Sequence, residues 1–216
     1  MTFRKLVLVP LFLLFSVALT AGAAEPQGSV LVTAVKGQVF RLVPNAKEPV
    51  SAFIKLKTGD LLELIGDAQV QLVFFGSHRQ ELWSGNGKLE IEPQQGKGTG
   101  LPQPQVKTLP EMLVRQIAKT PSIDSQGRAG VVRLRSIPTP EALAKLDGDY
   151  RRLRMEAARD DLNPELFLLA GLLEMRELDR VEQTLKDMQA ARPDNMEVKV
   201  LVSLYRKTLQ NLREKG

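Results

Sequence analysis

The sequence predicts an α+β protein built as two domains: an N-terminal all-β domain of the sandwich or barrel-like type, and a C-terminal helical bundle. Three observations predict this class. Apolar and polar residues alternate from Val30 to Ile91, which is the period of half-buried strands. Residues 94–110 are rich in Gln, Gly and Pro. From Thr139 onward, apolar residues recur with the period of a helix.

The first 24 residues have the pattern of a secretory signal peptide. Arg4 and Lys5 precede an apolar run from Leu6 to Leu19, and the small residues Ala21 to Ala24 follow it. This run is shorter than the roughly 20 residues that a membrane-spanning helix needs, and signal peptidase cuts after an A-x-A pattern. We therefore predict a cleaved leader at residues 1–24, a periplasmic mature chain, and no membrane-spanning segment after cleavage.

Composition excludes several classes of site. The chain has no cysteine and one histidine, so disulfides and zinc or haem sites built from these residues are not expected. No loop has the calcium-binding pattern of spaced Asp and Asn residues. Without Arg4 and Lys5 the chain has 28 basic and 25 acidic residues, a net charge of +3. So small an excess does not predict nucleic-acid binding, and we expect no metal and no cofactor.

About seven short strands are predicted for a β domain at residues 28–93. Each is an alternating or apolar run that ends at turn residues such as Lys36-Gly37 or Gly66-Asp67. The last two runs are predicted to form a hairpin, because Asn86-Gly87 suits the positive φ angles of a tight turn. The predicted strands are Val30 to Ala34, Val39 to Val43, Phe53 to Leu56, Leu61 to Ile65, Val70 to Phe74, His78 to Trp83 and Lys88 to Ile91.

The same region carries a set of motifs in a distinctive order. They are Gly37-Gln38-Val39, the run from Leu56 to Leu61, the run from Gly66 to Leu72, and Leu89-Glu90-Ile91. Together they resemble the FecR domain, an extracytoplasmic β module, over residues 29–92. The resemblance implies a periplasmic binding module and hints at a role in envelope signalling.

Residues 94–110 are interpreted as a linker between the two domains. Gly96, Gly98 and Gly100 surround Lys97 and Thr99, but they lack the G-K-[ST] ending and the following helix of a phosphate-binding loop. A flexible connection is therefore the favoured interpretation of these glycines.

Residues 111–138 are predicted to form a short helix followed by an irregular connection. Thr108 and Glu111 have the spacing of a capping box, which predicts a helix that ends at Ile117. The apolar residues from Val131 to Leu134 suggest one further strand.

An α-helical domain is predicted at residues 139–213. Thr139 and Pro140 form a helix start signal, which Asn163-Pro164 repeats. The region from Leu162 to Tyr205 resembles a tetratricopeptide-type helical hairpin, on the positions of Leu168, Leu172, Leu185 and Pro193-Asp194-Asn195. Four antiparallel helices are predicted: Thr139 to Ala157, Pro164 to Met175, Leu178 to Arg192 and Asp194 to Leu212. The second is apolar almost all round, so we expect it to be buried between the others.

No arrangement in the sequence predicts an enzyme. Ser77 and His78 are adjacent, with Asp67 and Glu81 nearby, but neighbours on a strand point to opposite faces and the G-x-S-x-G turn is absent. Paired glutamates for glycoside hydrolysis would need a deep cleft, which a small β module hardly provides. Solvated strand faces are the favoured interpretation of Glu63, Glu81, Glu90 and Glu92.

Two groups of residues are candidates for contact with other molecules. His78 and Trp83 are candidate ligand contacts; core packing of Trp83 is the alternative. Arg151, Arg152 and Arg154 are candidate contacts for an anionic partner. The alternative is a solvated helix face on which Asp147 and Glu156, at four-residue spacing, balance the charge.

These features together predict an exported, non-enzymatic binding or scaffold protein. We expect its β domain to bind a cell-wall glycan or small ligand and its helical domain to contact another protein. The alternatives are a soluble sensor component of an envelope signalling system and an envelope hydrolase that depends on His78.

Overall fold

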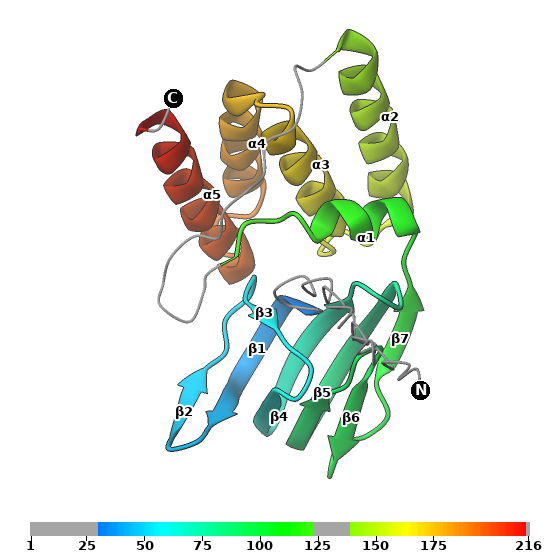
Figure 1. The fold of residues 1–216 in the computed structure, drawn as a ribbon, viewed down its shortest axis with the longest axis vertical. Helices are drawn as coiled ribbons and strands as arrows, with labels where there is room; N and C mark the ends of the chain where they lie inside the picture. The colour runs from blue at the N-terminus through cyan, green and yellow to red at the C-terminus, as the bar shows by residue number, and fades with distance from the viewer. Residues whose placement is uncertain (1–29, 123–138, 215–216) are drawn as a thin grey trace, which may run out of the picture.

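The computed structural model describes residues 30–122 and 139–214 (Figure 1). The predicted leader and the predicted strand from Val131 to Leu134 lie outside the described residues. The described chain is mixed α/β, with an antiparallel open sheet of seven strands and five helices. None of these helices is long and apolar enough to cross a membrane.

Three long strands form the centre of the sheet. They are β1 (Val30–Val43), β4 (Leu61–Phe74) and β5 (Arg79–Ile91), in the order β1-β4-β5. Along β1 lie the short strands β2 (Ala46–Pro49) and β3 (Lys55–Leu56), and along β5 lie β6 (Gly96–Thr99) and β7 (Gln105–Thr108). The result is one open antiparallel sheet in place of the predicted sandwich or barrel-like arrangement.

Several predicted turns are irregularities inside the long strands. The chain continues as strand through Lys36-Gly37, Gly66-Asp67 and Asn86-Gly87, so the predicted hairpin at the last of these does not form. The pairing register shifts at the same level in β1, β4 and β5, which is how a bulge bends a sheet. Gly37 has φ 77°, and a Cβ there would lie 3.1 Å from the Cα of Ala68. Glycine is therefore required at this crossing.

The predicted linker at residues 94–110 is wrong, because it contains β6 and β7. Gly96 and Gly98 in β6 lie directly against Trp83: a Cβ on Gly98 would be 2.5 Å from Cζ3 of the indole. These glycines allow close packing and are not a sign of flexibility. Glycine occupies every second position of β6 and has no side chain, so the sequence of this strand lacks the alternation of apolar and polar residues that predicts a strand.

The helices lie close to their predicted positions. Thr139 caps α2 as predicted, with its Oγ1 accepting from the backbone N of Ala142 at 3.2 Å. The capping box predicted for α1 is wrong, because Thr108 belongs to β7 and no side chain caps that helix. The helices are α1 (Glu111–Ile117), α2 (Pro140–Glu156), α3 (Asn163–Glu174), α4 (Leu178–Ala191) and α5 (Met196–Glu214).

Helix α3 is the buried centre of the helical region, as its apolar sequence predicts. Every residue from Asn163 to Leu173 is buried, with α2 and α4 packed against it. Gly171 lets α2 approach, since a Cβ there would lie 2.5 Å from a methyl carbon of Leu146. The side chain of Leu146 therefore packs onto the α3 backbone.

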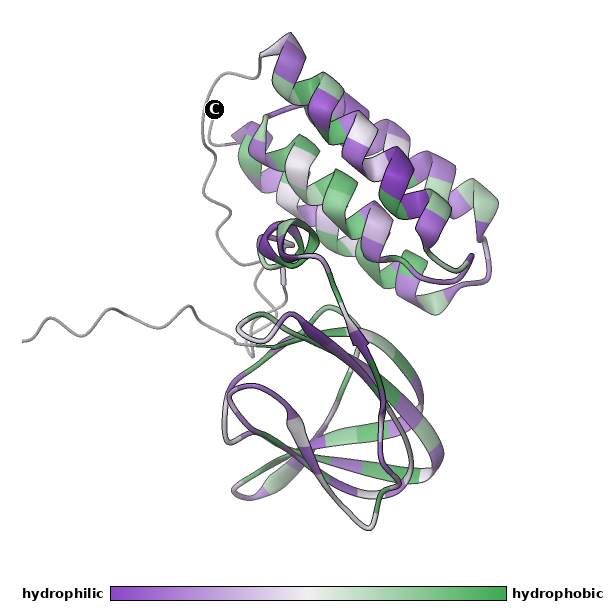
Figure 2. Ribbon diagram, turned by 90° about the vertical axis from the view of Figure 1, so that its right-hand side faces the viewer, coloured by the Kyte–Doolittle hydropathy of each residue, from purple (hydrophilic) through white to green (hydrophobic). Residues whose placement is uncertain are grey.

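The sheet and the helices share a hydrophobic core. Leu31, Phe53 and Val73 belong to the same buried cluster as the apolar residues of all five helices. Helix α1 lies between the other helices and the sheet (Figures 1 and 2). A separate cluster, which includes Leu72 and Trp83, fills the opposite face of the sheet. Burial of the shared cluster therefore holds the two regions together.

Lys55 adds a polar link across this junction. Its Nζ donates to the carbonyl O of Ala118 at 2.8 Å, at the C-terminus of α1, where the helix dipole favours a cation. Burial lowers the pKa of Lys55 below its ordinary value of 10.5. The unfolded chain therefore binds more protons at this group than the folded protein does in the alkaline range.

Stability should depend on this buried amine. Because the folded pKa is lowered, the Lys55 contribution to the free energy of unfolding should rise with pH until pH passes 10.5. We expect the stability of the wild type to increase relative to Lys55→Met between neutral pH and pH 10.5. Urea unfolding of both proteins at several pH values measures this difference. A difference that stays constant or falls with pH would contradict the buried position of the amine.

Candidate functional site

Trp83, a candidate ligand contact from the sequence, lies in the core and is not at the surface. It is 3% exposed, and its Nε1 donates to Oε2 of Glu81 at 2.8 Å. Glu81 is fully buried, and its carboxylate also accepts from the backbone N of Gly96 at 2.9 Å and from Nε of Arg79 at 2.6 Å. This network joins β5 to β6. The alternative of core packing is therefore the correct one for Trp83.

His78 lies in the turn between β4 and β5 and is half-buried. It has φ 53°, and its carbonyl O accepts from the backbone N of Leu109 at 2.8 Å. The neighbouring Ser77 donates its hydroxyl to the carbonyl O of Gln94 at 2.6 Å. Neither His78 nor Trp83 lines the two cavities described below. The structure thus does not bring the two candidate ligand contacts together in a common cavity there.

Two of the three candidate arginines lie on the exposed surface of α2. Arg151 donates from Nε to the carbonyl O of Asp147 at 3.3 Å, and Arg152 pairs with Asp149 at 2.9 Å. Both side chains are exposed, as the alternative of a solvated helix face predicts, but the charge partners differ from the predicted ones: the carboxylate of Asp147 pairs with Arg180, and Arg152 pairs with Asp149 and not with Glu156.

Arg154 points elsewhere, toward the loop between α2 and α3. Its guanidinium donates to both carboxylate oxygens of Glu165, at 3.0 and 3.1 Å, and to the carbonyl O of Asp161 at 2.7 Å. It also donates to the carbonyl groups of Ala157 and Ala158. Arg154 is therefore a positioning residue that holds this loop, and it does not form one surface with Arg151 and Arg152.

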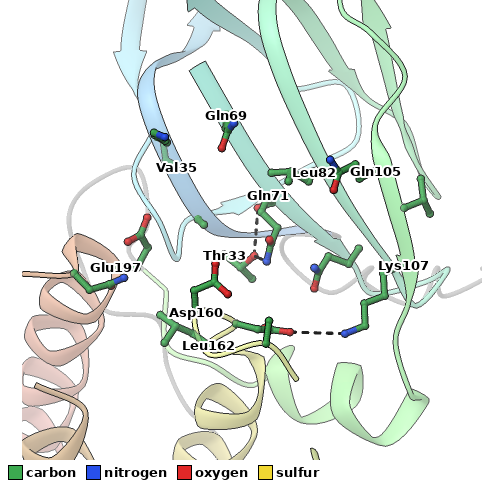
Figure 3. Close-up of a pocket in the computed structure, with 17 residues that line it drawn as sticks. Thr33, Val35, Gln69, Gln71, Leu82, Gln105, Lys107, Asp160, Leu162 and Glu197 are labelled. Atoms are coloured by element: carbon green, nitrogen blue, oxygen red, sulfur yellow. Dashed lines mark hydrogen bonds and ion pairs between the residues drawn. The ribbon is translucent and has the colours of Figure 1, made fainter. Parts of the chain in front are cut away.

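A cavity of about 510 Å³ lies where the sheet meets the loops at the ends of the helices (Figure 3). We call it the junction groove. One wall is the sheet and the other is the helical region, so the groove exists only because the two regions are packed together. Its lining residues are Thr33, Ala34, Val35, Lys36, Gln69, Gln71, Gln80, Leu82, Gln105, Val106, Lys107, Ala158, Asp160, Asp161, Leu162, Asn195 and Glu197.

The sheet wall of the junction groove is rich in glutamine. Gln71 pairs with Leu82, which in turn pairs with Gln105, so the three lie in one row across β4, β5 and β7. Gln69 is two residues before Gln71 on β4 and therefore shares its face. Gln80 is two residues before Leu82 on β5 and therefore shares the face of Leu82. Figure 3 shows Gln69, Gln71 and Gln105 along this wall.

The helical wall carries carboxylates. Asp160 and Asp161 come from the loop between α2 and α3, and Glu197 comes from the first turn of α5. The side chains of Asp160 and Glu197 have no hydrogen bond or ion pair with another described residue, and the same holds for the side chains of Gln69 and Gln105 on the sheet wall. These four side chains are therefore available to a bound molecule within the described structure.

Two contacts join the walls of the groove. The Nδ2 of Asn163 donates to Oε1 of Gln80 at 2.6 Å, and Lys107 Nζ lies 3.8 Å from the carboxylate of Asp161. On the sheet wall, Nε2 of Gln71 donates to the hydroxyl of Thr33 at 2.9 Å. These contacts fix the spacing of the two walls before any ligand binds.

The glutamines of the sheet wall are suited to recognition of polar, uncharged groups. Each glutamine amide can donate two hydrogen bonds and accept at its oxygen, so the sheet wall can match hydroxyl, amide or carbonyl groups. Half-buried Leu82 adds a small apolar contact between the amides. Among the described residues there is no group of three or more His, Cys, Asp or Glu side chains arranged to hold a metal ion.

A partial signal of this site is present in the sequence. Gln69 and Gln71 alternate with buried Val70 and Leu72, which places the glutamines on the outer face of a strand. Nothing in the sequence indicated that Gln105 would join them, because β7 lies in the segment interpreted as a linker. Comparison with protein-family models, with curated proteins and with solved structures finds no match for this chain.

Proposed function

We propose that this chain is an exported, non-enzymatic binding protein whose ligand lies in the junction groove. The observation that carries the proposal is the glutamine-lined sheet wall facing unpaired side chains of the helical wall. The leader pattern at residues 1–24 supports export, and the motifs that resemble the FecR domain support a periplasmic binding module. In this proposal the sheet region and the helical region are two domains that pack against each other through the shared core. The α3–α4 hairpin, as a tetratricopeptide-like element, contacts a protein partner.

The ligand class follows from the chemistry of the sheet wall. Sugar hydroxyls both donate and accept hydrogen bonds, and an N-acetyl group adds one amide and one methyl group. Glutamine amides match the polar groups, and Leu82 matches the methyl group. We therefore propose a cell-wall glycan that carries N-acetyl groups as the ligand.

Binding of an N-acetylated oligosaccharide tests the function. Isothermal titration calorimetry should show saturable binding of the N-acetylglucosamine tetramer, and weaker binding of the glucose tetramer, which lacks the amide. The double variant Gln69→Ala/Gln105→Ala removes two unpaired amides, so its affinity should fall about tenfold.

The matched control is Gln38→Ala, which removes an exposed glutamine on β1 outside the groove. Its affinity should equal that of the wild type. Absence of binding by the wild type, or equal losses in the control and in the double variant, would count against the groove as a glycan site. Circular dichroism of each variant shows whether the fold is kept.

A further inference from the structure

A second cavity lies inside the helical region, away from the sheet wall. Its volume is about 480 Å³, and it is lined by residues of α2, α3 and α4 and by the residues that follow α2 and α4. We call it the arginine pocket. Its polar lining includes Tyr150, Arg154, Arg159, Glu165, Asp187 and Arg192.

A buried ion-pair cluster forms part of the wall of the arginine pocket. The side chain of Glu165 is 6% exposed and lies between two guanidinium groups: the Nη1 of Arg154 is 3.0 Å from its Oε2, and Arg192 is 3.7 Å from its Oε1. The guanidinium of Arg154 donates to Glu165 and to carbonyl groups of the loop. The negative charge of Glu165 is thus already matched by Arg154.

Donors remain for a bound molecule. Arg192 donates one Nη2 hydrogen bond, to the carbonyl O of Arg159 at 2.6 Å, and its Nε and Nη1 have no such bond within the described residues. The guanidinium of Arg159 is exposed and has no hydrogen bond or ion pair with a described residue. Tyr150 also lines the pocket.

The charges of the lining favour an anion. Three arginines face two carboxylates, those of Glu165 and Asp187, so the pocket carries a net positive charge. Burial, followed by the Glu165 carboxylate, raises the pKa of Tyr150, and its hydroxyl therefore stays protonated at neutral pH and can donate. Guanidinium groups bind planar and tetrahedral oxyanions through paired N–H donors.

We propose that the arginine pocket binds a compact oxyanion, a phosphate or carboxylate group, through Arg159, Arg192 and Tyr150. Arg154 and Glu165 hold Arg192 and the loop after α2 in position. The sequence predicted an anionic contact at Arg151, Arg152 and Arg154. The proposed site lies instead on the side of α2 that faces α3 and α4. This site does not depend on what the junction groove binds.

Titration with two small anions tests the proposal. The full chain is titrated with inorganic phosphate and with malonate at constant ionic strength, and binding is followed by calorimetry. Arg159→Gln should weaken the binding of the preferred anion about tenfold, because one charged pair of donors is lost. Tyr150→Phe should weaken it less, since only one neutral donor is lost.

The matched control is Arg151→Gln, which removes one exposed arginine from α2 outside the pocket. It should change the affinity less than about twofold, since distant exposed charges are screened by salt. Saturation by phosphate identifies a phosphate-bearing ligand, and saturation by malonate identifies a carboxylate-bearing one. Failure of both to saturate, or equal losses in Arg159→Gln and Arg151→Gln, would overturn the proposal. Both substitutions are at exposed side chains, so folding is not at risk.

Discussion

Replacement of Glu81 by Leu should lower the free energy of unfolding by about 3 kcal/mol. The fully buried carboxylate accepts from Trp83, from Gly96 and from Arg79, and the variant leaves the buried indole N–H of Trp83 and the half-buried N–H of Gly96 without this acceptor. Urea unfolding measures the loss. Because Trp83 is the only tryptophan, its fluorescence should also report a changed environment for the indole.

Glu90→Gln is the matched control, because it removes one negative charge from an exposed position on the same strand. Its stability should stay within about 0.5 kcal/mol of the wild type. Glu81→Gln keeps an acceptor oxygen, so its free energy of unfolding should lie between those of Glu81→Leu and Glu90→Gln. A loss below about 1 kcal/mol for Glu81→Leu would show that the network does not hold β6 against β5.

Phe53→Ala should destabilise the protein by about 3–5 kcal/mol, the usual cost of removing a buried phenylalanine. Phe53 is fully buried in the cluster that joins the sheet to the helices. We expect the unfolding transitions of both regions to shift together. Fluorescence of Trp83 reports the sheet, and far-ultraviolet circular dichroism is dominated by the helices.

The control for this prediction is Phe40→Ala. Phe40 is a half-buried residue of β1 that lies outside both hydrophobic clusters. Its replacement should therefore lower the free energy of unfolding clearly less than Phe53→Ala does. A fluorescence transition that moves in Phe53→Ala while the helical signal stays in place would contradict a core shared by the two regions.

The helical half of the fold could be predicted because its signals are local. Thr139 and Pro140 start α2, and the apolar sequence of α3 fits its burial on all sides. Such features depend on residues within one or two turns of each other. Even there one boundary differs: the helix predicted to begin at Asp194 begins at Met196, and Asn195 accepts from the backbone N of Val198 at 2.8 Å.

The sheet was predicted less well because glycine has two opposite uses. At Gly37 the sequence predicts a turn, yet the residue permits a close crossing inside one long strand. At Gly98 it predicts flexibility, yet the residue makes room for an indole ring. In both cases the deciding contact comes from a residue on another strand, Ala68 or Trp83, so neighbouring residues in the sequence carry no sign of it.

The candidate site was the least predictable part. The walls of the junction groove come from residues as far apart in the sequence as Thr33 and Glu197, and only tertiary packing brings them together. The charge of Arg154 was visible in the sequence, but its five acceptors were not. A count of charges along α2 cannot distinguish an arginine that holds a loop from one that is free to bind a partner.

Arg154 also connects the two cavities. The loop that it holds through backbone carbonyl groups supplies Ala158, Asp160 and Asp161 to the helical wall of the junction groove. The same guanidinium group lines the arginine pocket. The shape of the groove therefore depends on the ion-pair cluster around Glu165 as well as on the shared core.

The proposed ligand contacts both walls of the junction groove at once. Nuclear magnetic resonance of the full chain, titrated with the N-acetylglucosamine tetramer, tests this most directly. We expect the amide signals of Gln69 and Gln105 on the sheet, and those of Asp160 and Glu197 on the helical wall, to shift along one common binding curve. Shifts confined to one wall, or to residues of β2 far from the groove, would contradict it.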